Sequence, residues 1–120
     1  MEPIGKRRWA IAEGYIPGSS TGVARQLTSH ETACILNAGA EEAHVAITVF
    51  YGDREPDGPH RLVVPARRTL HVRLDKLGIP AEVDYSTVVE SDVPIVVQHT
   101  RLDSRQDALA LLSTIAYASD

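Results

Sequence analysis

Polar side chains able to bind a ligand or catalyse a reaction are concentrated at the end of one apolar stretch, residues 93–106. The stretch begins with β-branched residues, as does a strand that is buried on both faces. With the two-residue period of a strand, His99 and Arg101 continue the face of the aliphatic residues before them, and Asp103 and Arg105 follow at once. This order predicts a strand that leaves the core and enters a polar cavity or an interface.

Further carboxylates and an imidazole lie where other predicted strands pass into loops, a common place for binding groups. Arginines beside carboxylates and an imidazole suit hydroxyl-rich or anionic small ligands. We therefore expect one polar ligand pocket in which His99 and Arg101 lie with Glu13, His30 or Glu31, while Asp103 and Arg105 close its rim.

The alternative for the same residues is structural. Buried polar groups usually bond to one another, so these side chains would also fit a self-neutralising cluster or a subunit interface. Arg101, Asp103 and Arg105 in particular have the spacing of an ion-pair ladder along one strand.

Motifs of common catalytic and nucleotide-binding sites are absent from the chain. It contains no GxGxxG, GxxxxGK[ST], HExxH or paired CxxC sequence, and its five histidines include no HxH pair of the kind found in cupin metal sites. His30, Glu31 and His99 would have to converge in space to hold a metal. We expect a non-enzymatic protein with no metal and no cofactor; the competing class is a hydrolase or isomerase built on His99 and Glu31.

The elements that position these residues are predicted to be strands. Short segments of alternating polarity, separated by turn signals every 8–12 residues, are typical of an antiparallel β-sandwich or jelly roll. We expect an all-β fold of about eight strands in a single domain, residues 1–120. The expected strands cover 8–13, 30–37, 44–51, 62–64, 68–74, 85–90, the central stretch from 93, and the end of 108–117.

Three local features complete the expected fold. Residues 52–59 form a loop, and residues 75–80 form one helical turn capped by Asp75. Leu70, Val72 and Leu74 point inward and His71 faces solvent. Cys34, the only cysteine, lies in an apolar run and is expected to be a buried, inert thiol.

Composition limits the compartment and the partners. The chain has 120 residues, 43% hydrophobic and 23% charged, as ordinary globular domains do. No apolar run approaches the roughly 20 residues of a membrane span, and the N-terminus lacks the apolar region of a signal peptide, so we expect a cytoplasmic protein. A net charge of −4 argues against general nucleic-acid binding, although Arg61, Arg67 and Arg68 leave DNA as a less favoured partner.

Several long segments closely resemble the sensory rhodopsin transducer family, a family of soluble cytoplasmic proteins. They are WAIAEGYIP at 9–17, SHETACILNAG at 29–39, VPARRT at 64–69, and VPIVVQHTRLDSRQ at 93–106 with LLSTIAY at 111–117. The resemblance implies a β-sandwich protomer in a ring-like homotetramer that docks on the cytoplasmic face of a microbial sensory rhodopsin and relays its light state. It also implies an alternative, a sugar-like or other small-molecule binding domain without a rhodopsin partner.

Overall fold

The structure, a computed structural model, describes residues 3–18, 29–103 and 110–120. In these residues the chain forms eight β-strands and one short 3-10 helix, and all strand pairs are antiparallel. The expected all-β antiparallel sandwich is confirmed. Within the described ranges no helix has the length and apolar character that a membrane crossing requires.

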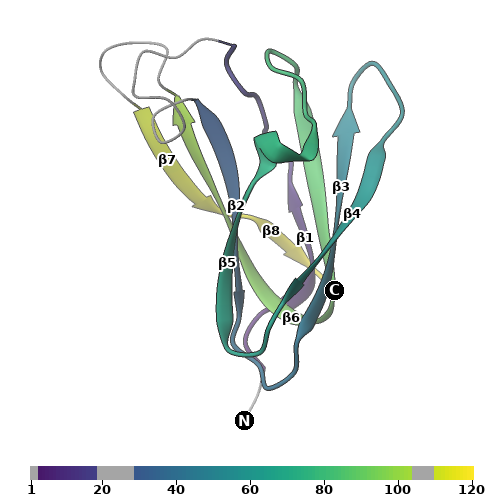
Figure 1. The fold of residues 1–120 in the computed structure, drawn as a ribbon, viewed down its shortest axis with the longest axis vertical. Coiled ribbons are helices and arrows are strands. Elements are labelled where there is room, and N and C mark those ends of the chain that lie inside the picture. Colours follow the sequence, from purple (N-terminus) through teal and green to yellow (C-terminus); the bar gives the residue numbers. More distant parts are fainter. Residues whose placement is uncertain (1–2, 19–28, 104–109) are drawn as a thin grey trace.

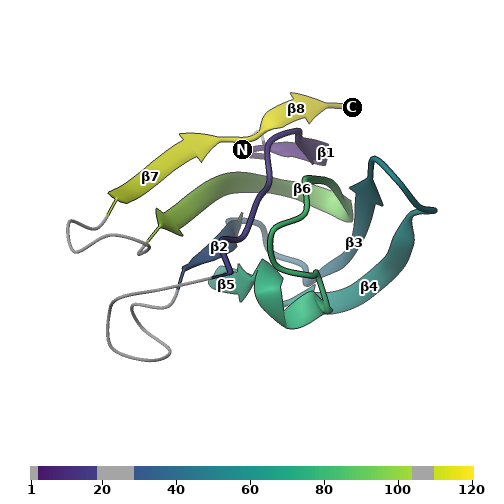
Figure 2. The ribbon, with the colours of Figure 1, turned by 90° about the horizontal axis from the view of Figure 1, so that it is seen from above.

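Two sheets make up the sandwich, and one strand belongs to both (Figures 1 and 2). The first sheet has the order β4-β3-β6-β1-β8, with bounds Asp57–Val64, Ala43–Tyr51, Tyr85–Asp103, Lys6–Ile11 and Tyr117–Ser119. In the second sheet, β2 (His30–Asn37) pairs with β5 (Arg68–Arg73) and with the second half of β6, which also pairs with β7 (Ala110–Ile115).

Strand β6 organises the molecule because it runs through both sheets. Its first half pairs with β3 and its second half with β2. Arg8 pairs with Glu90 and Lys6 with Ile95, so residues 91–94 of β6 bulge opposite a single residue of β1. At this bulge β6 turns, and Figure 1 shows its two ends rising to the same end of the sandwich.

The residue pattern predicts two separate strands here, 85–90 and the stretch from 93, and that prediction is wrong. Pro94 suggested a strand start, since proline cannot donate to a sheet ladder. It lies instead inside β6, within the bulge where the ladder is interrupted and no donor is required.

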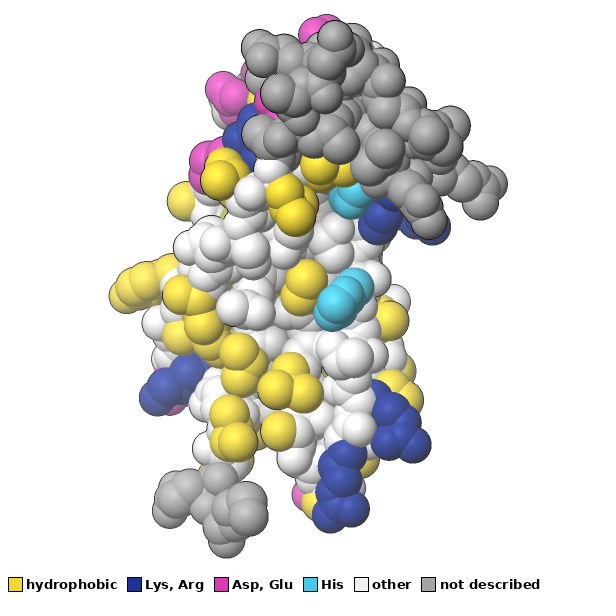
Figure 3. All heavy atoms as spheres, turned by 90° about the vertical axis from the view of Figure 1, so that its left-hand side faces the viewer, with side chains coloured by type: hydrophobic (Ala, Val, Ile, Leu, Met, Phe, Trp, Pro, Cys, Tyr) yellow, Lys and Arg dark blue, Asp and Glu magenta, His cyan; other side chains and the backbone are white. Residues whose placement is uncertain are grey.

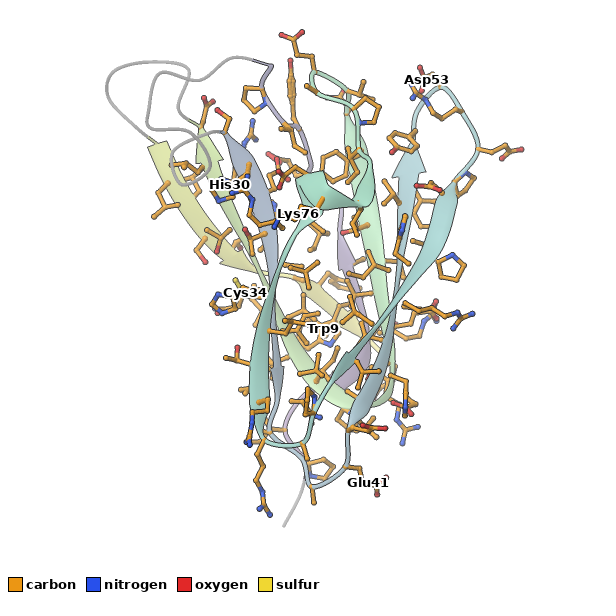
Figure 4. The ribbon with its side chains drawn as sticks, viewed as in Figure 1. Trp9, His30, Cys34, Glu41, Asp53 and Lys76 are labelled. Atoms are coloured by element: carbon orange, nitrogen blue, oxygen red, sulfur yellow. The ribbon has the colours of Figure 1, made fainter. Side chains whose placement is uncertain are left out.

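The core fills the space between the sheets. Its members come from five strands and the residue after β7: Trp9, Ile11, Ile35, Ala43, Val45, Ile47, Val64, Val89, Ile95, Val97 and Ala116. Trp9 lies near the centre (Figure 4), and its indole N–H donates to the carbonyls of Lys6 and Ile95, 3.0 and 3.1 Å away. The tryptophan therefore fixes β1 to β6 at the edge of the bulge.

Several predicted boundaries are corrected by the structure. Strand β1 ends at Ile11 rather than at residue 13, and β4 begins at Asp57, inside the predicted loop 52–59. The helical turn is the 3-10 helix η1, Leu74–Leu77, and Asp75 does not cap it. The Asp75 carboxylate instead accepts from the guanidinium of Arg73 at 2.9 Å.

Two burial predictions also change. Leu74 is fully buried and Val72 packs against the core, but Leu70 is 36% exposed, because β5 pairs only with β2 at the edge of its sheet. Cys34 is half-buried rather than buried, and its Sγ lies 3.8 Å from the hydroxyl of Thr100. His71 is exposed, as predicted.

Candidate functional site

The site is centred on Glu31, a carboxylate with no exposed surface. Glu31 is the second residue of β2 and lies opposite Arg101 of β6 in the sheet register. Alternation along β2 places its side chain on the same face as Ala33 and Ile35, which are also completely buried. A charged group is thus held among core residues, where it is stable only if its oxygens are well hydrogen-bonded.

Both oxygens of Glu31 have protein partners. Oε1 accepts from the hydroxyl of Tyr85 at 2.7 Å and lies 2.9 Å from Nε2 of His99. Oε2 accepts from the backbone N–H of Tyr15 at 2.8 Å and lies 3.7 Å from Nε of Arg101. When Glu31 is ionised it can only accept, and Nε2 of His99 is then the donor in this contact.

The path of β6 explains how these groups meet. Tyr85 is its first residue and pairs with Tyr51 in the first sheet, whereas His99 pairs with Ala33 in the second. The two ends of β6 rise to the same end of the sandwich (Figure 1). Both side chains therefore reach Glu31. Burial, and then the negative charge of Glu31, raise the pKa of Tyr85 far above its ordinary value of 10, so the phenol remains a donor.

Gly14 allows Tyr85 to take this position. A Cβ atom on Gly14 would lie 2.7 Å from the Tyr85 ring, closer than any real contact. The two backbones are also joined, since the N–H of Tyr85 donates to the carbonyl of Gly14 at 3.0 Å. The segment after β1 is thereby fixed against the site.

Arg101 connects the buried carboxylate to the surface. Its side chain is 21% exposed and forms ion pairs with Glu31 on one side and with Glu13 on the other. The Glu13 side chain is 64% exposed. The cluster therefore runs outward from His99 and Tyr85, through Glu31 and Arg101, to a carboxylate in solvent.

A cleft of about 640 Å³ opens at this end of the molecule. It is lined by the segment after β1, by the end of β3 and by the start of β6, with one residue from the second half of β6: Ala12, Glu13, Gly14, Tyr15, Phe50, Tyr51, Gly52, Asp84, Tyr85, Ser86 and Arg101. Its volume is in the range of small-molecule sites. Glu31 and His99 are not among the lining residues; they lie behind the wall, where they hold Tyr85 and Arg101 in place.

The structure brings together four of the seven candidate residues: Glu13, Glu31, His99 and Arg101. Of the two residues proposed for β2, Glu31 joins the cluster, and alternation directs His30 to the opposite face of the sheet. Asp103 is half-buried at the end of β6, and Arg105 lies outside the described residues.

Two contributions to the site were not predicted. Tyr85 is expected only as the first residue of a strand, although its place on the same face as Thr87 and Val89 indicates an inward hydroxyl that needs a partner. The donor from Tyr15 is a backbone group, and side-chain types do not reveal it.

The structure also locates the residues considered for metal binding and for DNA binding. In the part of the chain that the structure describes, no three His, Cys, Asp or Glu side chains are grouped so that they could hold a metal ion. Arg61 lies on β4, Arg67 in the following turn and Arg68 at the start of β5, and all three are exposed.

Comparison with known proteins gives one consistent result. Residues 4–118 match the model of the family described as Anabaena sensory rhodopsin transducer. A crystal structure titled Thermotoga maritima 1070 is similar, with 41% identity, 97% of each chain covered and a TM-score of 0.89. The Anabaena sensory rhodopsin transducer is similar with 58% identity over 83% of this chain and 100% of that chain, and a TM-score of 0.73. A search of curated protein sequences found no match.

Proposed function

The chain belongs to the Anabaena sensory rhodopsin transducer family, and from this membership we propose that it is a non-enzymatic, cytoplasmic signal transducer. Its partner is the cytoplasmic face of a microbial sensory rhodopsin, whose light state it relays. The proposal rests on the 58% identity to the Anabaena transducer, over 83% of this chain and the whole of that chain.

A relay of this kind has a thermodynamic requirement. A receptor changes the state of its partner only if the partner binds the two receptor states with different affinity. The transducer must therefore bind the dark and the illuminated rhodopsin unequally, and the ratio of the two dissociation constants limits the signal that it can carry.

The proposal is tested by titrating the full chain onto a microbial sensory rhodopsin in lipid nanodiscs, in the dark and under steady illumination. We expect saturable binding with dissociation constants that differ by about fivefold or more, the lower limit of typical allosteric coupling. Empty nanodiscs are the control. Absence of binding, or identical constants in both conditions, contradicts the transducer proposal.

The second candidate is a small-molecule binding domain without a rhodopsin partner. The cleft supports it, because aromatic walls and a few fixed polar groups are typical of ligand sites. In this proposal Glu13 and Arg101 contact the ligand with Tyr85, while Glu31 and His99 position them. Binding of a sugar-like ligand, seen as a raised melting temperature that Arg101→Ala abolishes in a folded protein, would support it.

Two other classes are less favoured. A hydrolase or isomerase needs an acid–base pair within reach of substrate, and Glu31 and His99 are within hydrogen-bond distance of each other but lie behind the cleft wall. DNA binding through Arg61, Arg67 and Arg68 would show affinity that falls steeply with salt, which filter binding at two salt concentrations would detect.

A further inference from the structure

The charges around the cleft do not balance. Three carboxylates border it: Glu13 and Asp84 on its surface and Glu31 directly behind its wall. Among the lining residues in the described part of the chain, Arg101 is the single cationic side chain, and it is already paired with Glu13 and Glu31. The cleft therefore presents a net negative field to any ligand that enters it.

The walls of the cleft are aromatic. Four of the lining residues are aromatic: Phe50 and Tyr51 from the end of β3, Tyr15 from the segment after β1, and Tyr85 from the start of β6. Aromatic faces carry partial negative charge and attract cations.

The chain itself shows this preference at Tyr51. The guanidinium carbon of Arg54 lies 4.9 Å from the centre of the Tyr51 ring. Asp53 neutralises the charge of Arg54, because its two carboxylate oxygens accept from the Arg54 guanidinium at 2.9 and 3.1 Å. This ion pair therefore does not change the net charge of the cleft. A ring of the cleft wall thus already binds a guanidinium group.

We infer that the cleft is a site for an organic cation, an ammonium or guanidinium group on a body large enough to touch the aromatic walls. The inference rests on the proposal that the cleft binds a ligand, and it specifies the charge of that ligand. It disfavours the anionic ligand that the arginines suggested, because Arg101 is neutralised by its own carboxylates. The cation is either a free amine or the basic side chain of a partner protein.

Calorimetric titration of the full chain with three probes of similar shape tests the sign of the charge. The probes are 2-phenylethylammonium, 2-phenylethanol and phenylacetate. We expect the ammonium to bind most tightly, with an affinity that falls as sodium chloride is added. Tighter binding of phenylacetate, equal binding of the ammonium and the alcohol, or no binding by any probe would each overturn the inference.

Substitutions locate the binding within the cleft. Asp84→Asn should weaken ammonium binding about two- to fivefold, as loss of an exposed ion pair does. Tyr51→Leu should weaken it about two- to fivefold, while Tyr51→Phe retains it, since phenylalanine keeps the aromatic face. The matched control is Glu41→Gln, an exposed carboxylate at the opposite end of the molecule (Figure 4), which should have no effect. An equal effect of Glu41→Gln and Asp84→Asn would contradict a local site.

A capped Gly-Arg-Gly peptide distinguishes the two sources of the cation. Binding of the peptide tighter than that of 2-phenylethylammonium assigns the cleft to a partner's side chain, and the reverse assigns it to a free amine. Failure of every cationic probe would leave the transducer proposal intact, because that proposal depends on dark and light affinities for a rhodopsin and not on these probes.

Discussion

Two carboxylates that contact the same arginine are in opposite situations. Glu31 is fully buried and accepts from Tyr15, Tyr85 and His99, whereas Glu13 is largely in solvent. Breaking a buried ion pair leaves uncompensated donors in a medium of low dielectric constant and strongly lowers the free energy of unfolding. An exposed ion pair contributes little to that free energy. The shared Arg101 makes Glu13 a matched control for Glu31.

We therefore expect Glu31→Ala to lower the free energy of unfolding by about 3–5 kcal/mol. Glu13→Ala should lower it by less than about 1 kcal/mol. Urea denaturation at one fixed protein concentration, with unchanged m-values, measures both. Similar losses for the two variants would mean that the buried cluster does not contribute to stability as its contacts indicate.

A second residue-scale prediction concerns His44, at the end of the sandwich away from the cleft. Its Nδ1 lies 2.7 Å from Oδ2 of Asp92, and its Nε2 lies 3.2 Å from Oε1 of Glu42. The hydrogen bond to Asp92 is the main cause that raises the pKa of His44 above its ordinary 6.5. The backbone N–H of His44 donates to the same carboxylate and lowers the pKa of Asp92 below 3.8.

The pair therefore stabilises the fold in a defined pH window. Its contribution is complete between about pH 3.8 and 6.5. It declines at higher pH as His44 loses its proton through its raised pKa, and at lower pH as Asp92 is protonated through its lowered pKa. An NMR titration of the His44 ring should show a pKa above 6.5 that falls when Asp92 is changed to Asn. Asp53→Asn, at the other end of the molecule, should leave the curve unchanged, and a shift there would rule out a local cause.

At the scale of elements, the sequence predicts the features that depend on the alternation of side chains along a strand. Strand β2 has the predicted bounds, and the alternation that places His99 and Arg101 on one face also places them beside Glu31. This part of the site depends on the two-residue period and on the strand register, and both can be inferred from the order of polar and apolar residues.

What the sequence does not reveal is the bulge of β6. A strand that bends through residues 91–94 joins two sheets, and only this bend brings Tyr85 to the carboxylate that His99 also contacts. The bend depends on pairing with β1, which is distant in the chain. The backbone donor of Tyr15, whose partner Glu31 is 16 residues away, is undetected for the same reason. The expected cap by Asp75 fails for a local reason, because its carboxylate pairs with Arg73.

At the scale of the whole molecule, the described part of three adjacent strands carries no Asp, Glu, Lys or Arg on the outer face of the second sheet, and His30 is the titratable side chain that β2 places there. By alternation, this face carries His30, Thr32, Cys34 and Leu36 on β2, Val96, Gln98, Thr100 and Leu102 on β6, and Leu111, Ser113 and Ile115 on β7. Figure 3 views the molecule from this side and shows hydrophobic side chains across the face, with basic groups nearer its margins. Leu111 and Ile115 are 67% and 59% exposed.

An uncharged face on an edge strand is a pairing surface that monomeric proteins usually protect. Leu112, on the other face of β7, is also 67% exposed, so this strand is uncovered on both sides. We propose that a second copy of the chain covers it, in a homo-oligomer of the tetrameric kind that the family resemblance implies.

Substitution of Ile115 by Lys should then dissociate the oligomer, because burying an unpaired ammonium in an interface costs more free energy than the contact supplies. Val63→Lys is the matched control, since Val63 is also aliphatic and 47% exposed but lies on β4 in the other sheet.

Light scattering coupled to size-exclusion chromatography measures the mass, and the chain mass of 13.1 kDa makes each state distinct. We expect a multiple of 13.1 kDa for the unchanged chain and for Val63→Lys, and a smaller species for Ile115→Lys. A monomeric unchanged chain at micromolar concentration would remove the oligomer, and the exposed face of β7 would then have to be assigned to a different partner.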